Sequence, residues 1–241
     1  MAGYHRRILI TPRPGKATAA LEDDFHCMSV TISHDGKSIN SAIAVMDRAP
    51  WTTCPGAPAV LAETFAGIPL ADAVARGAKA KQSNCTHLHD LALLAAAHAA
   101  DAAPTRYDIF VGDPVDGVRV SEIGRDGAFL LHWEHRDDIL ETPEAIRGLH
   151  ILKLRDWIQS LPDAEREPAR LLQWASLVAH GRTVPMERQS DATRMPPNCF
   201  TFQPDRASIA RRVGKIIDFT TSGAEPLDHF DGSRFAARLV A

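Results

Sequence analysis

The chain has 241 residues, 45% of them hydrophobic and 24% charged, with a formal net charge of −3, a composition typical of soluble proteins with one large domain or two smaller ones. No basic stripe marks nucleic acid as a partner, and the longest apolar run, Leu91–Ala97, is far too short to span a membrane. Because the first residues lack the apolar core of a signal peptide, we expect a cytoplasmic protein whose four cysteines are free or metal-bound rather than disulfide-bonded.

A strand hairpin is predicted near the N-terminal end. Residues 24–34 alternate between apolar and polar positions, which predicts a strand. One face of that strand carries His26, Met28, Val30 and Ile32. Asp35 and Gly36 form a hairpin-turn signal, after which Ser38–Met46 is predicted to return as the second strand.

Three helices are predicted to follow this hairpin. The first covers Ala57–Phe65 and is ended by Gly67. A second, looser helix is predicted over Leu70–Lys79. The third begins at Cys85 and runs into an alanine-rich segment limited by Pro104. Its buried stripe consists of Leu88, Leu91, Leu94 and Ala95.

The second half of the chain begins with strands and continues mainly as helices. The predicted strands are Arg106–Val111, Val118–Ile123, Ala128–Trp133 and Cys199–Gln203, and the predicted helices are Ile146–Leu161, Ala164–His180 and Pro204–Val213. This order predicts an α+β fold, with small antiparallel sheets packed against helices, rather than a doubly wound sheet. We expect an α+β metal-site domain over residues 1–140 and a mainly helical substrate-pocket region over 141–241.

The segment Asn84–Asp90 concentrates more reactive side chains than any other and lies at the start of the third predicted helix. Unpaired N–H groups and the positive end of the helix dipole there favour the thiolate of Cys85. Other elements of a compact fold could bring further ligands to it, and thiolates with imidazole suit Zn²⁺ or iron better than Mg²⁺ or Ca²⁺. The predicted metal ligands are His26, Cys54 and Cys85, while His87 and Asp24 are predicted to move protons or to complete the site.

A pocket for a small-molecule substrate is predicted from aromatic and basic residues. Arg182 follows a probable helix cap and is suited to clamp a carboxylate, with a salt bridge as the alternative role. Cys199, beside two alternating phenylalanines, could line an apolar pocket or simply pack in the core. The full set of predicted substrate-binding residues is Trp51, Arg182, Cys199, Phe200 and Phe202.

Several motifs together resemble a bacterial family catalogued only as a domain of unknown function. They are Arg48-Ala-Pro-Trp-Thr-Thr-Cys-Pro55, Cys85-Thr-His-Leu-His-Asp-Leu91, His180-Gly-Arg182 and Cys199-Phe-Thr-Phe-Gln-Pro204. The resemblance covers nearly the whole chain, and Cys-Thr-His-Leu is the family hallmark. It implies no defined activity, only an association with the catabolism of small, aromatic molecules. The chain departs from the family pattern at Ile217, where an arginine is expected before Asp218.

Residues 24–100 are also similar in layout to iron–sulfur scaffold proteins of the SufE, NifU and IscU type. In that layout a strand carries one ligand and two cysteines each open a helix. The matching positions here are Asp24 or His26, then Cys54, then Cys85. Because the first position is not a cysteine, mixed His/Cys ligation of a single catalytic metal is favoured over cluster assembly.

Three functional hypotheses follow. The first is a zinc-dependent hydrolase or lyase acting on a small aromatic or acyl carbonyl compound. The second is an iron–sulfur or sulfur-handling scaffold that uses the same site. The third, ranked last, is a metal-free enzyme with Cys85 as nucleophile and His87 as base. The sequence leaves open the substrate, the reaction, the metal and whether the protein forms a homo-oligomer.

Overall fold

The computed structural model describes residues 1–75 and 77–230. Eight strands are hydrogen-bonded in the order β4-β3-β2-β1-β5-β6-β7-β8, and several helices accompany them, which confirms the α+β class. All eight strands belong to one sheet, whereas we expected small separate sheets. Two compact units can be distinguished, and each combines segments from before and after residue 140. Of the described residues, unit 1 comprises 1–7, 106–185 and 218–224, and unit 2 comprises 8–75, 77–105, 186–217 and 225–230.

The strands of unit 2 are the second half of β1 (Gly3–Arg13), then β2 (Lys16–Asp23), β3 (Cys27–His34) and β4 (Ile39–Arg48). The pairs β2–β3 and β3–β4 are antiparallel. The predicted hairpin is therefore confirmed as β3 and β4, but residues 24–26 lie in the turn before β3 rather than in the strand. Strands β1 and β2 have no predicted counterpart; in β2, Lys16–Asp23 is rich in alanine and contains Thr18 as its one β-branched residue, so the strand signal is weak.

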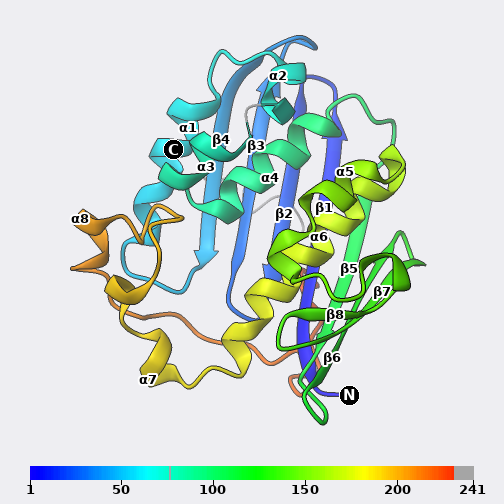
Figure 1. The fold of residues 1–241 in the computed structure, drawn as a ribbon. Coiled ribbons are helices and arrows are strands. Elements are labelled where there is room, and N and C mark those ends of the chain that lie inside the picture. Colours follow the sequence, from blue (N-terminus) through cyan, green and yellow to red (C-terminus); the bar gives the residue numbers. More distant parts are fainter. Residues whose placement is uncertain (76, 231–241) are drawn as a thin grey trace. The chain divides into compact units, whose positions relative to one another are not determined.

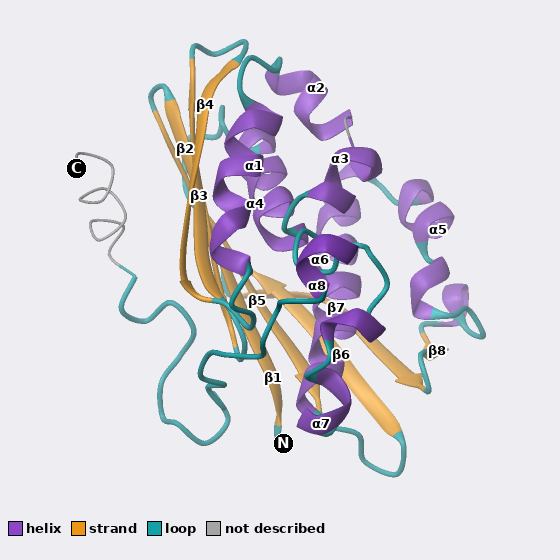
Figure 2. Ribbon diagram, turned by 90° about the vertical axis from the view of Figure 1, so that its left-hand side faces the viewer, coloured by secondary structure: helices purple, strands orange, loops and turns teal. Residues whose placement is uncertain are grey.

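The helices of unit 2 are α1 (Ala57–Phe65), α2 (Leu70–Ala75), α3 (Gly77–Ser83) and α4 (Thr86–Ala97). Figures 1 and 2 show α1 and α4 on one face of β2, β3 and β4, and α4 packs on β3 and β2. The bounds predicted for the first helix are confirmed, and Gly67 ends it with a φ of +77°. Cys85 is the N-cap of α4, which ends before the predicted limit at Pro104. The helix predicted over Leu70–Lys79 is confirmed at the described residues, which are helical in α2 up to Ala75 and in α3 from Gly77; Arg76 lies outside the described residues.

Unit 1 contains β5 (Thr105–Gly112), β6 (Val118–Arg125), β7 (Ala128–Arg136), β8 (Ile139–Thr142), α5 (Arg155–Ser160) and α6 (Asp163–Ala179). The predicted strands β5 to β7 and the long helix α6 are confirmed. The helix predicted over Ile146–Leu161 is wrong. Gly148, at a φ of +80°, and two 3-10 turns, Glu144–Ile146 and Ile151–Lys153, interrupt it before α5.

The segment from 180 to 217 is mostly irregular. It contains 3-10 turns at His180–Arg182 and Ala192–Arg194 and the short helices α7 (Met186–Gln189) and α8 (Pro204–Ala207). The strand predicted over Cys199–Gln203 is a turn, closed by a 3.1 Å hydrogen bond from Phe202 N to Cys199 O. The helix predicted from Pro204 to Val213 stops after one turn because residues 211–213 align along 50–52. In the part of the chain that is described, no helix is long and apolar enough to cross a bilayer.

A buried histidine in unit 1 makes its stability depend on pH. His135 is only 1% exposed, and its Nε2 lies 3.2 Å from the hydroxyl of Ser121, which in turn accepts a hydrogen bond from Ser176. Burial lowers the pKa of His135 from 6.5 to about 4. The charged neighbours alter it less: Asp138 opposes the shift, and Arg119 and His180 add to it.

We expect acid to destabilise the protein through this group. Above pH 6.5 the histidine is neutral in both the folded and the unfolded chain; between 6.5 and 4 only the unfolded chain takes up the proton. The free energy of unfolding should therefore fall by about 2 kcal/mol between pH 7.5 and pH 5 from His135 alone. Urea unfolding at both pH values measures this change. The free energy of unfolding should fall less from pH 7.5 to pH 5 in His135→Gln than in the exposed control His132→Gln. Equal falls in the two variants would contradict the expectation.

Candidate metal centre

Three buried side chains in unit 2 form a group that could hold a metal ion. The candidate ligand atoms of Asp23, His26 and His87 all lie within 4.8 Å of one another. The two imidazole rings are stacked, with centroids 4.0 Å apart and planes inclined by 28°. The structure thus brings together a predicted ligand and a predicted proton carrier, His26 and His87.

Asp23 shapes the turn that carries His26. Its Oδ1 accepts hydrogen bonds of 2.8 Å from the backbone N–H groups of Phe25 and His26, and lies 3.0 Å from Nδ1 of His26. Because a carboxylate only accepts, Nδ1 carries the hydrogen in the metal-free protein. For Asp23 and His26 to ligate one ion together, the metal would take the place of this hydrogen between Nδ1 and the carboxylate.

The same turn is held from outside by Arg48, the last residue of β4. Its guanidinium donates to the carbonyl oxygens of Asp24 (2.7 Å) and Asp23 (2.8 Å) and to Oε1 of Glu22 (2.9 Å). Ile217 N also donates to Asp24 O, at 2.9 Å. Five backbone and side-chain groups are therefore tied together at the point where β2 passes into β3.

Asp23 stands where the sequence predicted Asp24. Asp24 is fully buried, but it does not belong to the group of three ligand atoms. The expectation failed because it assumed a strand from residue 24, in which Asp24 and His26 would share a face. A turn rotates the chain instead and aims Asp23 at the imidazole. Aspartate readily accepts from N–H groups two and three residues further on, so Asp-x-x-His at a strand end was the available signal.

His87 reaches the group from the first turn of α4. Its side chain is 9% exposed, and Nδ1 lies 3.5 Å from the hydroxyl of Thr86. Because α4 packs along β3 and β2, its N-terminal end lies near the β2–β3 turn. The predicted start of this helix agrees with the observed position of His87 in the first turn of α4, and the carboxylate that it meets at the turn is that of Asp23.

The predicted thiol ligands gather in a different set. Among the described residues, neither Cys54 nor Cys85 joins His26 and His87 in a group of three ligand atoms. Sγ of Cys54 lies 3.4 Å from the hydroxyl of Thr201, two residues beyond Cys199. Phe200 N donates to Asn84 O at 2.9 Å, which joins the neighbours of Cys199 and Cys85. We call Cys54, Cys85 and Cys199 the thiol cluster, although their sulfur atoms are not all within 4.8 Å of one another.

Burial keeps these thiols protonated. It raises the pKa of Cys85 to about 12, which outweighs the opposite effect of the backbone amides of Leu88 and His87. Burial also raises the pKa of Cys54 and of Cys199. The thiolate expected for Cys85 from the helix terminus is therefore wrong for the metal-free protein, because loss of solvation exceeds the helix effect.

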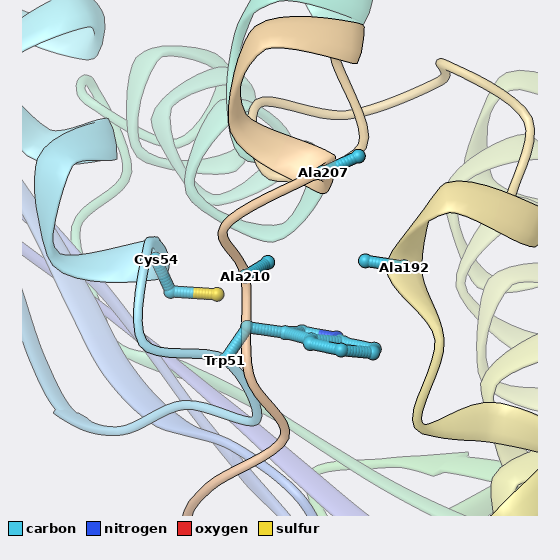
Figure 3. Packing of buried hydrophobic residues seen from close by; sticks show 5 residues of the cluster. All are labelled: Trp51, Cys54, Ala192, Ala207 and Ala210. Atoms are coloured by element: carbon cyan, nitrogen blue, oxygen red, sulfur yellow. The ribbon is translucent and has the colours of Figure 1, made fainter.

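The predicted pocket residues of unit 2 are mostly packed against one another. Trp51 and Cys54 share a buried apolar cluster with three alanines, and Figure 3 shows the Cys54 side chain pointing towards Ala210. The ring of Phe202 meets that of Trp51 edge-on at 5.7 Å. Phe200 is buried beneath the guanidinium of Arg206, 4.1 Å from its ring centre. For the two phenylalanines beside Cys199, these contacts match core packing, which was the alternative to a pocket lining at Cys199.

Arg182 lies in unit 1 and already has carboxylate partners. Its Nε and Nη2 donate to the two oxygens of Asp113 at 3.1 and 3.2 Å, and Nη1 lies 3.4 Å from Asp218. This is the salt-bridge alternative to a substrate clamp.

A surface hollow of unit 2 lies away from the metal group. Its volume is about 690 Å³, and it is lined by His34, Lys37 and the alanines at the end of α4. The hollow adjoins the last residues of β3 and α4, whereas His26 precedes the first residue of β3 and His87 lies in the first turn of α4. The hollow therefore contributes nothing to the metal group.

Comparison of the chain with models of known protein families and with curated proteins gives no match. The two resemblances found in the sequence accordingly stay predictions. The function has to be argued from the geometry of unit 2.

Proposed function

We propose that the protein is a zinc-dependent hydrolase or lyase that acts on a small aromatic or acyl carbonyl compound. The proposal depends on one observation: two imidazoles and a carboxylate, all buried, lie within 4.8 Å of one another. Two histidines and one carboxylate are a known ligand set of catalytic zinc, which keeps a fourth position for water or substrate. The same set also occurs with non-haem iron.

The energetic cost of the arrangement supports a bound cation. Asp23 is fully buried, and His26 and His87 are 8% and 9% exposed. Burying a carboxylate is expensive unless a positive charge or several donors compensate for it. Backbone N–H groups and the His26 ring compensate Oδ1, and a cation would compensate the carboxylate further. When bound, zinc would polarise a substrate carbonyl or acidify a water molecule.

Metal analysis of the purified protein tests this proposal. We expect one zinc per chain, bound at least 100-fold more weakly by His26→Ala and His87→Ala and equally well by the exposed control His132→Ala. Zinc-loaded protein should turn over members of a panel of phenyl esters and aromatic 2-oxo acids, and His26→Ala should not. A folded wild-type protein that binds no zinc at micromolar concentration would refute the proposal.

Cobalt substitution identifies the ligands. With Asp23, His26 and His87 as ligands, the cobalt protein should lack the intense near-ultraviolet charge-transfer band of cobalt–thiolate bonds. Cys85→Ser and Cys54→Ser should then bind zinc as the wild type does. A charge-transfer band that disappears in Cys85→Ser would instead support the ligand set predicted from the sequence.

The thiol cluster favours a second candidate, an iron–sulfur or sulfur-handling scaffold. Cys54, Cys85 and Cys199 all belong to unit 2, and three cysteines suit iron–sulfur ligation better than a single pair would; their sulfur atoms would have to approach one another to hold a cluster, because they are not all within 4.8 Å. Anaerobic reconstitution with iron and sulfide tests this function. A brown chromophore lost in Cys54→Ser, Cys85→Ser and Cys199→Ser, but kept in His26→Ala, would favour the scaffold over the enzyme.

A further inference from the structure

Arg212 is a half-buried cation with aromatic surroundings. Its guanidinium carbon lies 5.5 Å from the ring centre of Trp51 and 5.9 Å from that of Phe25. Its backbone forms an antiparallel bridge with Trp51. Hydrogen bonds on both sides, from Thr52 N to Arg211 O and from Val213 N to Pro50 O, fix this segment. The position of Arg212 is therefore built into the fold.

No protein anion neutralises this guanidinium within residues 1–75 and 77–230. None of their hydrogen bonds or ion pairs involves the Arg212 side chain, whereas Arg48 pairs with Glu22 and Arg182 with Asp113. Burial also lowers the pKa of Arg212 below its usual value. A desolvated guanidinium without a carboxylate is costly, and the faces of two rings compensate for only part of that cost.

Arg212 is also near the metal group. The ring of Phe25, which it faces, stands edge-on to the ring of His26 at 6.3 Å. The separations of 5.9 and 6.3 Å place the guanidinium carbon within about 12 Å of the His26 ring centre. One elongated small molecule could therefore reach both Arg212 and the space beside His26, which are at most about 12 Å apart.

We propose that Arg212, whose guanidinium lies beside the rings of Trp51 and Phe25, binds the carboxylate of an aromatic acid. We further propose that such acids are the substrate class of the metal site. The second part rests on the proposed function. The guanidinium fork matches the geometry of a carboxylate. Phosphate fits less well, because a single guanidinium would leave part of its charge of about −1.5 to −2 uncompensated in a half-buried position.

Calorimetric titration with benzoate, benzamide and inorganic phosphate tests the proposal. We expect benzoate to bind the wild type, at least 10-fold more tightly than benzamide or phosphate. Arg212→Met should lose at least 10-fold in benzoate affinity and keep its weak benzamide affinity. Arg212→Lys, which keeps the charge without the fork, should lie between them, and exposed Arg211→Met should match the wild type. Urea unfolding checks that each variant is folded.

Equal benzoate affinity in the wild type and both Arg212 variants, or no benzoate binding by the wild type, would overturn the proposal. Repeating the titration on chelator-treated protein separates it from the proposed function. Benzoate binding that depends on Arg212 in a chain that never binds zinc would leave the acid site standing and refute the enzyme. Zinc binding through His26 and His87 without Arg212-dependent benzoate binding would refute the acid site and leave the proposed enzyme standing.

Discussion

Replacing Arg48 by methionine is expected to lower the free energy of unfolding by about 3 kcal/mol and to weaken zinc binding at least tenfold. The side chain of Arg48 is only 11% exposed, and methionine keeps much of its apolar volume without any donor. The substitution would leave Glu22 and the carbonyl oxygens of Asp23 and Asp24 without their charged donor. Because these groups form the turn before His26, the loss should reach the metal group.

Urea unfolding and competitive zinc titration measure the two effects. Arg13→Met, which removes the same charge from an exposed position at the end of β1, is the matched control and should change either quantity little. A variant that is destabilised but binds zinc normally would show that the turn keeps its shape without Arg48. A variant as stable as the control would show that water replaces the guanidinium.

Local chemistry made part of unit 2 predictable. The alternation of apolar and polar residues identified β3, and its apolar residues Met28, Val30 and Ile32 are indeed fully buried. The Asp35-Gly36 signal marked the turn, where Gly36 has a φ of +87°. The bounds of α1 followed from a proline at its start and a glycine beyond its end. Each of these features is encoded within a few residues, so the sequence alone could reveal it.

Features that depend on distant segments were not predictable. The segment after α8 reads as a helix, but its backbone pairs with residues 50–52 and brings Arg212 to Trp51. Likewise, the helix terminus at Cys85 favours a thiolate, and only the packing of other segments around it reverses that preference. Burial is a property of the whole fold, and residue spacing does not report it.

The candidate site lies between these two cases. His26 and His87 could be proposed from their residue types and their places at element ends. Whether they would meet each other or the cysteines depended on the turn geometry at Asp23. Because the strand begins three residues later than predicted, the carboxylate of the candidate group is that of Asp23 and not that of Asp24.

Two substitutions of Asp23 should separate its structural role from its role in metal binding. Asp23→Ala removes the acceptor of two buried backbone N–H groups, those of Phe25 and His26, and should cost about 3 kcal/mol of the free energy of unfolding. Asp23→Asn keeps an oxygen for both bonds, so its stability should stay within about 1 kcal/mol of the wild type. Because asparagine lacks the negative charge, zinc affinity should still fall by about 10- to 100-fold.

Asp35 provides a matched control within the same chain. Its Oδ1 accepts from the N–H groups two and three residues ahead, at 2.8 and 2.7 Å, as Asp23 does, but in an exposed turn. Water can replace that carboxylate, so Asp35→Ala should cost less than about 1 kcal/mol and leave zinc binding unchanged. If Asp23→Asn bound zinc like the wild type, the charge of Asp23 would have no part in holding the metal. The two turns would then differ only in burial, and His26 and His87 alone would remain as ligands from this group.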